Sequence, residues 1–379
     1  FPLEAAEAPD LLIARPVRKA LITPAARLQW LDPGLTDAQA VSRIEALSRE
    51  GALALEAKFE RWNEQHEKLI EQLNTWIDIR GYREGSGWVS AVDRRRAADK
   101  ILESWRHNLQ ARPELAVNDG REILDFSGAY LGDLPKLPAM FGHVTELNLS
   151  GIKLTEQGSN DFLRAFTRVR SLTLSHNGLN QLPEVVREFT SLTRLEAAHN
   201  DLREAADVER CLMNMPALEW LDLSENTLET LDVSSLPQLA HLHLQANILV
   251  EWPTGVLQAP WLQRLNLSNN QIETIPFEIW EVHFDGLRRG TRLGDNLLDA
   301  ADLERVREYY AETGNSMGIT QQELDRDLDD DPWAEGEDEE DDHPEVVPPA
   351  EQKAQWFSGV PANSSRHAVW DRLKAAEDS

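Results

Sequence analysis

A short pattern of apolar residues and asparagine recurs along the middle of the chain, and this pattern limits the possible folds more than any other feature. A clear copy has apolar residues at its first, fourth, sixth and eleventh positions and asparagine at its ninth, and the weaker copies replace one or more of these residues. The clearest copies begin at residues 169, 192, 218, 239 and 262, and weaker copies begin at 121, 144 and 288. Successive copies start 21 to 26 residues apart. This recurrence indicates a stack of similar structural units, because one such unit cannot bury its own apolar face.

The period and the pattern are those of a leucine-rich repeat. In Leu221-Asp222-Leu223 the side chains alternate between the two faces of a strand, so both leucines point into the repeat. Asn226 can then bond the backbone where the chain leaves the strand. We predict an α/β fold: a leucine-rich-repeat solenoid over residues 113–320, with a parallel β-sheet on its concave face and a helical C-terminal cap.

The N-terminal third has the spacing of helices. Thr36 and Gln39 form a capping-box pattern, and apolar residues from Leu55 to Trp76 fall on one helical stripe. A second stripe runs from Ala98 to Leu109, after a break at 81–87 and before Pro113. We predict an irregular segment over 1–34 and an α-helical hairpin over 35–112 that shields the end of the repeats. The alternative, a coiled-coil partner site, is less favoured because fewer than four clean heptads are present.

Charge is concentrated near the C-terminal end. The chain carries a formal charge of −28, and the stretch 323–342 contains 13 acidic residues and one basic residue, Arg326. Such a run repels itself and stays solvated, so we predict a disordered acidic linker over 321–352 rather than a charged helix face. The acidic balance argues against nucleic-acid binding, which requires basic surfaces. No apolar run has the length of a membrane-spanning helix.

The sequence offers no recognisable catalytic, metal or cofactor site. Cys211 is the only cysteine, which excludes an internal disulfide and multi-cysteine metal sites. Phosphate-loop, nucleophile-elbow and zinc-helix motifs are missing. His241 and His243 alternate on one strand, but without a third ligand they indicate a protein-binding surface more than a metal site. A solvated strand face without a special role is the third alternative.

Side chains at the outward strand positions predict where a partner binds. We expect Trp220 to be exposed, and an exposed tryptophan close to arginines is typical of a binding hot spot. The alternative is that Trp220 only packs flat against His241 and stabilises the sheet. The predicted partner-binding residues on the concave face are Arg194, Glu196, Trp220, Asp222, His241, His243, Arg264, Asn266 and Arg292.

Two segments resemble a known protein family. The tail from Trp356-Phe357-Ser358-Gly359 through Ala368-Val369-Trp370-Asp371-Arg372-Leu373 resembles the opening of the NEL ubiquitin-ligase domain. This domain follows short leucine-rich repeats in bacterial IpaH/SspH effectors and in large Pseudomonas-type toxin-like proteins. The helical stretch from Arg94 to Arg106 also resembles what precedes the repeats in the large proteins.

The resemblance implies a function for a longer parent protein. Residues 353–379 would begin a helical NEL-like domain, which transfers ubiquitin through a thioester on the cysteine of a Cys-x-Asp motif. The repeats would select a host protein substrate and restrain the ligase domain. Ubiquitin and a ubiquitin-conjugating enzyme would bind through the domain after Ser379. The parent would be secreted by a bacterium and delivered into host cytoplasm.

The sequence departs from that family at its cysteine. Cys211 is followed by Leu212 and Met213 instead of the x-Asp of the motif, so no residue present here takes the catalytic role. We therefore interpret the chain as a fragment that acts as a binding module of a cysteine-dependent ubiquitin-protein ligase. The alternative is a non-enzymatic repeat adaptor, or the repeat arm of a different toxin. A Cys-x-Asp domain after Ser379 would distinguish the two.

Overall fold

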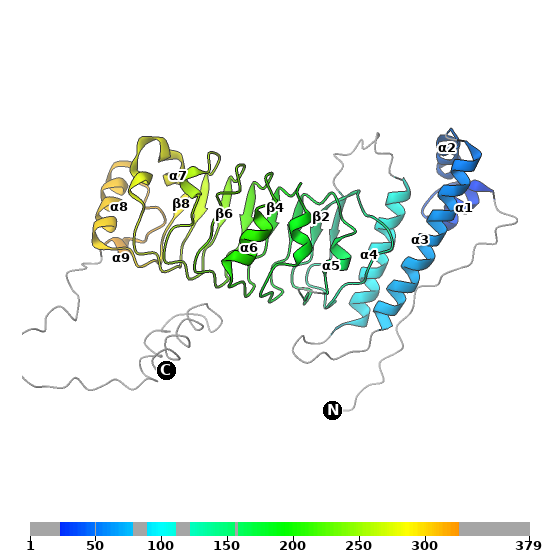
Figure 1. Ribbon diagram of the computed structural model, residues 1–379, viewed down its shortest axis with the longest axis horizontal. Helices are drawn as coiled ribbons and strands as arrows, with labels where there is room; N and C mark the ends of the chain where they lie inside the picture. Colours follow the sequence, from blue (N-terminus) through cyan, green and yellow to red (C-terminus); the bar gives the residue numbers. More distant parts are fainter. Residues whose placement is uncertain (1–22, 50, 79–88, 111–121, 156–157, 326–379) are drawn as a thin grey trace, which may run out of the picture. The chain divides into compact units, whose positions relative to one another are not determined.

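The computed structural model describes residues 23–49, 51–78, 89–110, 122–155 and 158–325 (Figure 1). They form two compact units. The first unit contains the described residues up to 197 together with 210–218, and the second contains 198–209 and the described residues from 219 onwards. The predicted linker beyond residue 325, the predicted NEL-like segment 353–379, and the break at 81–87 and Pro113 lie outside the described residues. The domain boundaries inferred from the sequence stay predictions.

Four helices begin the first unit: α1 (Pro24–Leu31), α2 (Asp37–Ser48), α3 (Ala52–Asp78) and α4 (Ala91–Gln110). The capping box of α2 is present, because the Thr36 side chain accepts from the Gln39 amide while the Gln39 side chain accepts from the Thr36 amide. Helices α3 and α4 lie side by side (Figure 1). They are antiparallel, since the end of α3 meets the start of α4 through a bond from Arg94 to the Trp76 carbonyl.

Helix α1 differs from the sequence-based prediction of an irregular segment over 1–34. Thr23 caps this helix, and Pro24 occupies its first position, where proline costs no hydrogen bond. Arg27 then anchors α1 on α3, with its guanidinium 2.7 Å from Glu56 and 4.2 Å from the centre of the Phe59 ring. The helical region is therefore larger than a hairpin, and its apolar stripes are buried within the unit.

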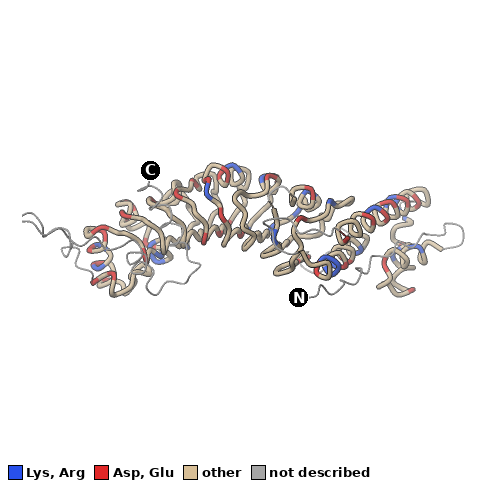
Figure 2. Tube along the Cα trace, turned by 90° about the horizontal axis from the view of Figure 1, so that it is seen from below, with Lys and Arg blue, Asp and Glu red and all other residues tan. Residues whose placement is uncertain are grey.

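The helices are joined to the first repeats by side chains that reach backbone carbonyls. Buried Arg94 donates to the Leu131 carbonyl at 2.9 Å as well as to that of Trp76. The Trp76 indole donates to the Asp133 carbonyl at 2.7 Å, and Lys100 donates to the Asp125 carbonyl at 2.6 Å. These bonds support the prediction that the helices shield the end of the array. Basic and acidic residues are interspersed along these helices (Figure 2).

The repeats form a parallel sheet of eight strands in sequence order, which confirms the predicted leucine-rich-repeat fold. Leucines of adjacent strands are in register, as in Leu147 with Leu172 and Leu242 with Leu265, and all four are buried. The strands are β1 (Glu122–Asp125), β2 (Val144–Asn148), β3 (Ser171–Thr173), β4 (Arg194–Glu196), β5 (Trp220–Asp222), β6 (His241–His243), β7 (Arg264–Asn266) and β8 (Thr291–Arg292).

Short helices and 3-10 turns connect the strands on the other side of the repeats. They are α5 (Asn160–Leu163), η1 (Glu184–Glu188), α6 (Ala205–Leu212), η2 (Val256–Gln258), η3 (Phe277–Trp280), η4 (Val282–Phe284) and α7 (Asp285–Gly290). Helices α8 (Ala300–Thr313) and α9 (Gln321–Leu324) follow the last strand as a helical cap.

Helix α9 corrects the start of the predicted acidic linker at residue 321. Thr320 and Glu323 form a second capping box, Leu324 is buried, and Arg307 donates to the Leu324 carbonyl. The start of the linker was predicted from the density of acidic residues alone. One buried apolar residue and a helix cap are enough to order a single helical turn within such a stretch.

Asparagine side chains complete the backbone hydrogen bonding between repeats. Asn247 is buried, and its Oδ1 accepts from the Leu228 amide at 3.0 Å. Its Nδ2 donates to the carbonyls of Leu223 and Leu244, each at 3.0 Å. Equivalent bonds are made by Asn177, Asn270 and Asn296. The predicted bonding role of the asparagine is therefore present.

The residue before the asparagine of a repeat has left-handed backbone geometry. Its φ lies between 53° and 61° in six repeats, although none of these residues is glycine: His176, His199, Glu225, Ala246, Asn269 and Asp295. This conformation costs roughly 1–2 kcal/mol for a residue with a Cβ atom. The hydrogen bonds of the following asparagine hold the turn in this geometry.

We expect Asn247→Ala to lower the free energy of unfolding by about 1–3 kcal/mol. The substitution leaves the Leu228 amide buried without a partner, whereas the Leu223 and Leu244 carbonyls still accept from Asn226 and Asn270. Urea denaturation of the full chain measures the change. Asn214→Ala is the matched control, because Asn214 is exposed. Equal midpoints for the two variants would contradict a structural role for the asparagine ladder.

His66 gives the helical region a specific sensitivity to acid. Its ring lies between Trp30 and Trp105, at 5.0 and 5.3 Å between ring centres, and it is 5% exposed. Burial, and then the nearby Arg106 charge, lower the pKa of His66 to about 4. The folded protein therefore holds His66 neutral, while the unfolded chain binds a proton below pH ~6.5.

We expect stability to fall between about pH 6.5 and pH 4 by on the order of 3 kcal/mol through this residue. His66→Phe keeps an aromatic ring at the position and removes the proton-binding group. The difference in urea midpoint between neutral and mildly acidic buffer should be smaller for this variant than for the unchanged protein. The same acid loss in both proteins would show that His66 titrates alike in the folded and unfolded states.

Candidate functional site: the outward sheet face

The strands place the predicted partner-binding residues on one sheet face, opposite the buried leucines. We call the side chains at these positions the outward sheet face, and its second-unit part consists of Trp220, Asp222, His241, His243, Arg264, Asn266 and Arg292. Parallel register places Trp220 beside His241 and His241 beside Arg264. Asp222, His243 and Asn266 form the next row, and Asn266 is followed by Arg292.

Trp220 stacks on both histidines of the neighbouring strand. Its ring centre lies 4.6 Å from that of His241 and 4.9 Å from that of His243, and the ring planes of Trp220 and His243 are inclined by only 29°. Trp220 is half-buried as a result, whereas the sequence analysis expected an exposed anchor. The alternative prediction placed Trp220 flat against His241; the two rings are in contact but tilted by 35°, and the stacked partner is His243. The cluster still presents a rigid aromatic surface, because the strands fix the rings.

Asp222 and Asn266 have a structural task that the sequence analysis missed. Oδ1 of Asp222 accepts from the Ser224 amide at 3.0 Å, and Oδ1 of Asn266 accepts from the Ser268 amide at 3.2 Å. Asn148 makes the same bond to Ser150. These are Asx turns that end the strand, and the signal was an Asp or Asn two residues before a serine. Their availability for a partner is correspondingly reduced.

Arg194 and Glu196 belong to the first unit and pair with each other. Arg194 Nε donates to Glu196 Oε1 at 2.7 Å, and Thr173 donates to the other carboxylate oxygen at 3.1 Å. Arg264 and Arg292, in the second unit, are exposed. Arg292 donates to the backbone carbonyls of Thr291 and Arg289. The structure thus separates the predicted residues into an ion pair and a second-unit cluster.

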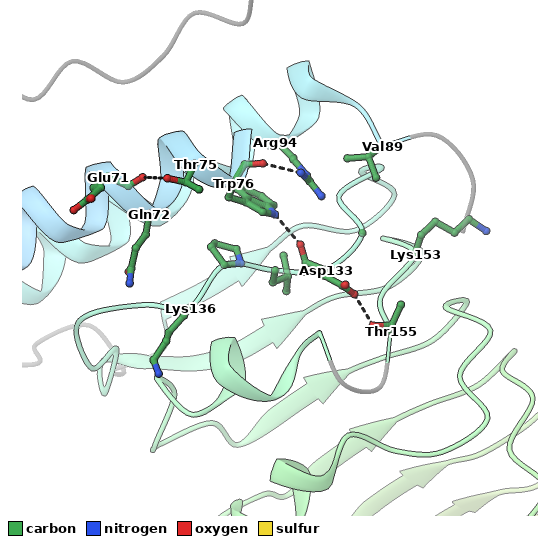
Figure 3. A pocket seen from close by; sticks show the side chains of 13 residues that line it. Glu71, Gln72, Thr75, Trp76, Val89, Arg94, Asp133, Lys136, Lys153 and Thr155 are labelled. Carbon is green, nitrogen blue, oxygen red and sulfur yellow. Dashed lines mark hydrogen bonds between the residues drawn. The ribbon is translucent and has the colours of Figure 1, made fainter. Parts of the chain in front are cut away.

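A second candidate site is a cavity of about 540 Å³ in the first unit, between α3, the start of α4 and the loops after β1 and β2 (Figure 3). Several polar groups at its wall already have partners, although the buried Gln72 side-chain oxygen does not. The Trp76 indole bonds the Asp133 carbonyl, Arg94 bonds the Trp76 carbonyl, and Thr155 donates to the Asp133 carboxylate at 2.5 Å. The cavity is therefore better explained by the junction of helices and repeats than by a ligand.

A buried polar cluster at the same junction also escaped the sequence analysis. Ser104 donates to Glu122 at 2.9 Å and lies 3.1 Å from Nε2 of His143. Burial favours the neutral acid, but the hydrogen bonds and charges of His143, then Ser104 and His107, outweigh it and lower the pKa of Glu122. Ser104 and Glu122 face the same ring nitrogen, whereas a catalytic triad uses both nitrogens of its histidine. The cluster therefore lacks the geometry of a nucleophilic site.

The described residues contain no group of three or more histidine, cysteine or acidic side chains that could hold a metal ion. Cys211 lies in α6 and is 5% exposed, so its thiol is packed in the repeat core. In the part of the chain that is described, no helix is long and apolar enough to cross a membrane. The side chains of the outward sheet face form an arrangement that can bind the surface of another molecule.

Comparisons with known proteins identify the repeat. Residues 261–282 match the family described as Leucine Rich Repeat. No curated protein matches the chain. Solved structures similar to the chain include an internalin from Listeria monocytogenes, at 22% identity and a TM-score of 0.34, which covers 47% of this chain and 54% of that one.

Two further structures are similar at the same level. One is the leucine-rich-repeat ectodomain of a plant membrane receptor kinase from Arabidopsis thaliana, in complex with Casparian strip integrity factor 2, at 24% identity, a TM-score of 0.37 and coverage of 45% and 24%. The other is a leucine-rich-repeat protein of Leptospira interrogans, at 22% identity, a TM-score of 0.36 and coverage of 45% and 54%. The chain spans about half the length of the two bacterial structures and a quarter of the plant ectodomain.

We expect a double-mutant cycle between Trp220→Ala and His243→Ala to give a coupling energy of about 0.5–1.5 kcal/mol in unfolding. Contacting aromatic rings couple by this amount, whereas residues that do not touch contribute additively. Urea midpoints of the two single variants and the double variant supply the measurement. Additive effects would mean that the stack does not stabilise the sheet.

Proposed function

We propose that this chain is a protein-binding repeat region that holds a protein partner on the outward sheet face of its second unit. The observation that carries the proposal is the stack of Trp220 on His241 and His243, with exposed Arg264 on the adjacent strand. Tryptophan and arginine are the residue types enriched at binding hot spots. Strands fix these side chains before a partner arrives, which lowers the entropy cost of binding.

We further propose that the parent protein is a secreted bacterial ubiquitin ligase of the NEL type. Support comes from the sequence of the tail between Trp356 and Leu373 and from the helical stretch before the repeats. In this proposal the partner is a host protein substrate met in host cytoplasm. In this proposal, ubiquitin and the conjugating enzyme bind through the ligase domain of the parent protein, after Ser379 of this chain.

The burial of Cys211 favours a second candidate, in which the chain serves as an adaptor or as the repeat arm of a different toxin. No other thiol exists in the chain, and this one lies in α6 without the Cys-x-Asp context of the ligase motif. The gene sequence downstream of Ser379 separates the candidates. A helical domain with Cys-x-Asp supports the ligase, and an unrelated domain supports the second candidate.

We expect Trp220→Ala to weaken partner binding by about 2 kcal/mol, or roughly 30-fold, if Trp220 is the anchor of the interface. The full chain is used as bait, and the captured partner is quantified from host-cell lysate. Trp261→Ala is the matched control, because Trp261 is an exposed tryptophan in the turn before β7. Since Trp220 also stacks on two histidines, the urea midpoint of each variant is measured in parallel.

Three results would bear on this prediction. Loss of capture with Trp220→Ala and Arg264→Glu, at little change in midpoint, supports the outward sheet face. Full capture by both variants overturns the assignment. Loss of capture with Trp261→Ala alone would move the partner to the turns at the edge of the repeats.

A further inference from the structure

The outward sheet face of the second unit carries a pair of arginines without acidic partners. Arg264 on β7 and Arg292 on β8 are both exposed. Within the described residues no carboxylate pairs with either of them, and Arg292 donates only to backbone carbonyls. Most other arginines of this unit are engaged, as Arg289 is with Asp285 at 2.7 Å. Two exposed arginines thus have no carboxylate partner among the described residues, although the chain has a net charge of −28.

The segment 327–342 of this chain has the complementary charge. It contains 11 acidic residues and no lysine or arginine. Arginine is the side chain best suited to carboxylates, because its planar group can donate two parallel hydrogen bonds. The negative charge of the segment is therefore complementary to the positive charges of Arg264 and Arg292.

The structure places the last described residues before this segment beside β8. The Leu293 amide, at the end of β8, donates to the Met317 carbonyl at 2.8 Å. The Asp295 amide donates to Glu323 of α9 at 2.6 Å. The chain that leaves α9 thus begins at the edge of the sheet on which Arg292 lies.

The distance from this edge to the aromatic cluster is short. Adjacent strands are about 4.8 Å apart, so β8 and β5 are separated by roughly 15 Å. An extended chain covers about 3.3 Å per residue, so five or six residues reach across. A tether of this kind gives a local concentration on the order of millimolar, which favours even a weak intramolecular contact.

We propose that the acidic segment 327–342 docks on the outward sheet face at Arg264 and Arg292 and competes there with a protein partner. The competition rests on the proposed function, whereas the docking does not. Asp222 lies on the same face over β5, where its carboxylate is held by Ser224. Repulsion from Asp222 keeps the acidic segment over β7 and β8, at the border of the aromatic cluster.

Zero-length cross-linking of the full chain tests the docking. Arg264→Lys and Arg292→Lys each introduce an amine that a carbodiimide joins to a carboxylate in direct contact. Arg203→Lys is the control, because Arg203 is an exposed arginine in a turn of the same unit that pairs with Asp201. Mass spectrometry counts the links from each introduced lysine to residues 327–342, and a mixture of isotope-labelled and unlabelled chains identifies links within one molecule.

We expect links within one molecule from positions 264 and 292 about five-fold or more above those from position 203, and their loss in about 0.5 M salt, where exposed charges are screened. Equal yields from all three positions overturn the proposal, as do links found only between two molecules. The assay contains no partner, so a failed partner capture would count against the proposed function alone.

Discussion

Most repeats depend on an asparagine side chain that completes the backbone hydrogen bonding of the repeat before it. Asn247 shows the arrangement, because it accepts from the Leu228 amide and donates to the Leu223 carbonyl, both in the preceding repeat. Without Asn247 the Leu228 amide would be buried unpaired, at a cost of roughly 1–3 kcal/mol. The register of the strands follows, and with it the rows of side chains on the outward sheet face.

The same constraint explains which residues are available for recognition. Leucines of the strands fill the interior, so only the alternate positions can meet a partner. At several of these positions the side chain also ends the strand, as Asp222 and Asn266 do through their Asx turns. Recognition is left to the ring cluster of Trp220, His241 and His243 and to the exposed arginines beside it.

Much of the fold was predictable because it repeats. The ladder of Leu221, Leu223 and Asn226 fixes strand, interior and turn in every copy, and all eight strands lie where the ladder places them. Helix α1 and helix α9 were missed, since each is short and is ordered by a cap and by one or two contacts. Arg27 on Phe59 and Arg307 on the Leu324 carbonyl are such contacts, and sequence spacing does not reveal them.

The candidate site was predictable in position but not in detail. Alternation along a strand identified Trp220, His241 and His243 as members of one face. Their exposure depended on which rings meet across the strands, and that depends on side-chain rotation. The cluster of Ser104, Glu122 and His143 joins a residue of α4 with residues of the first two repeats. These residues are far apart in the sequence, so no local sequence pattern predicts that they meet.

The asparagine bonds also affect the order in which the repeats can fold during synthesis. The Leu228 amide donates to Asn247, and the Leu249 amide donates to Asn270. In both cases the acceptor is synthesised about 20 residues after the donor, so the hydrogen bonding of one repeat is completed by the next repeat. On the ribosome, the newest repeat therefore has one backbone amide without its asparagine acceptor until the next repeat emerges. Among the described residues no strand follows β8, so the Leu293 amide, whose counterpart Leu267 donates to the Arg292 carbonyl on the next strand, donates instead to the Met317 carbonyl after α8. Folding of the array would thus finish only when the segment beyond α8 has left the exit tunnel.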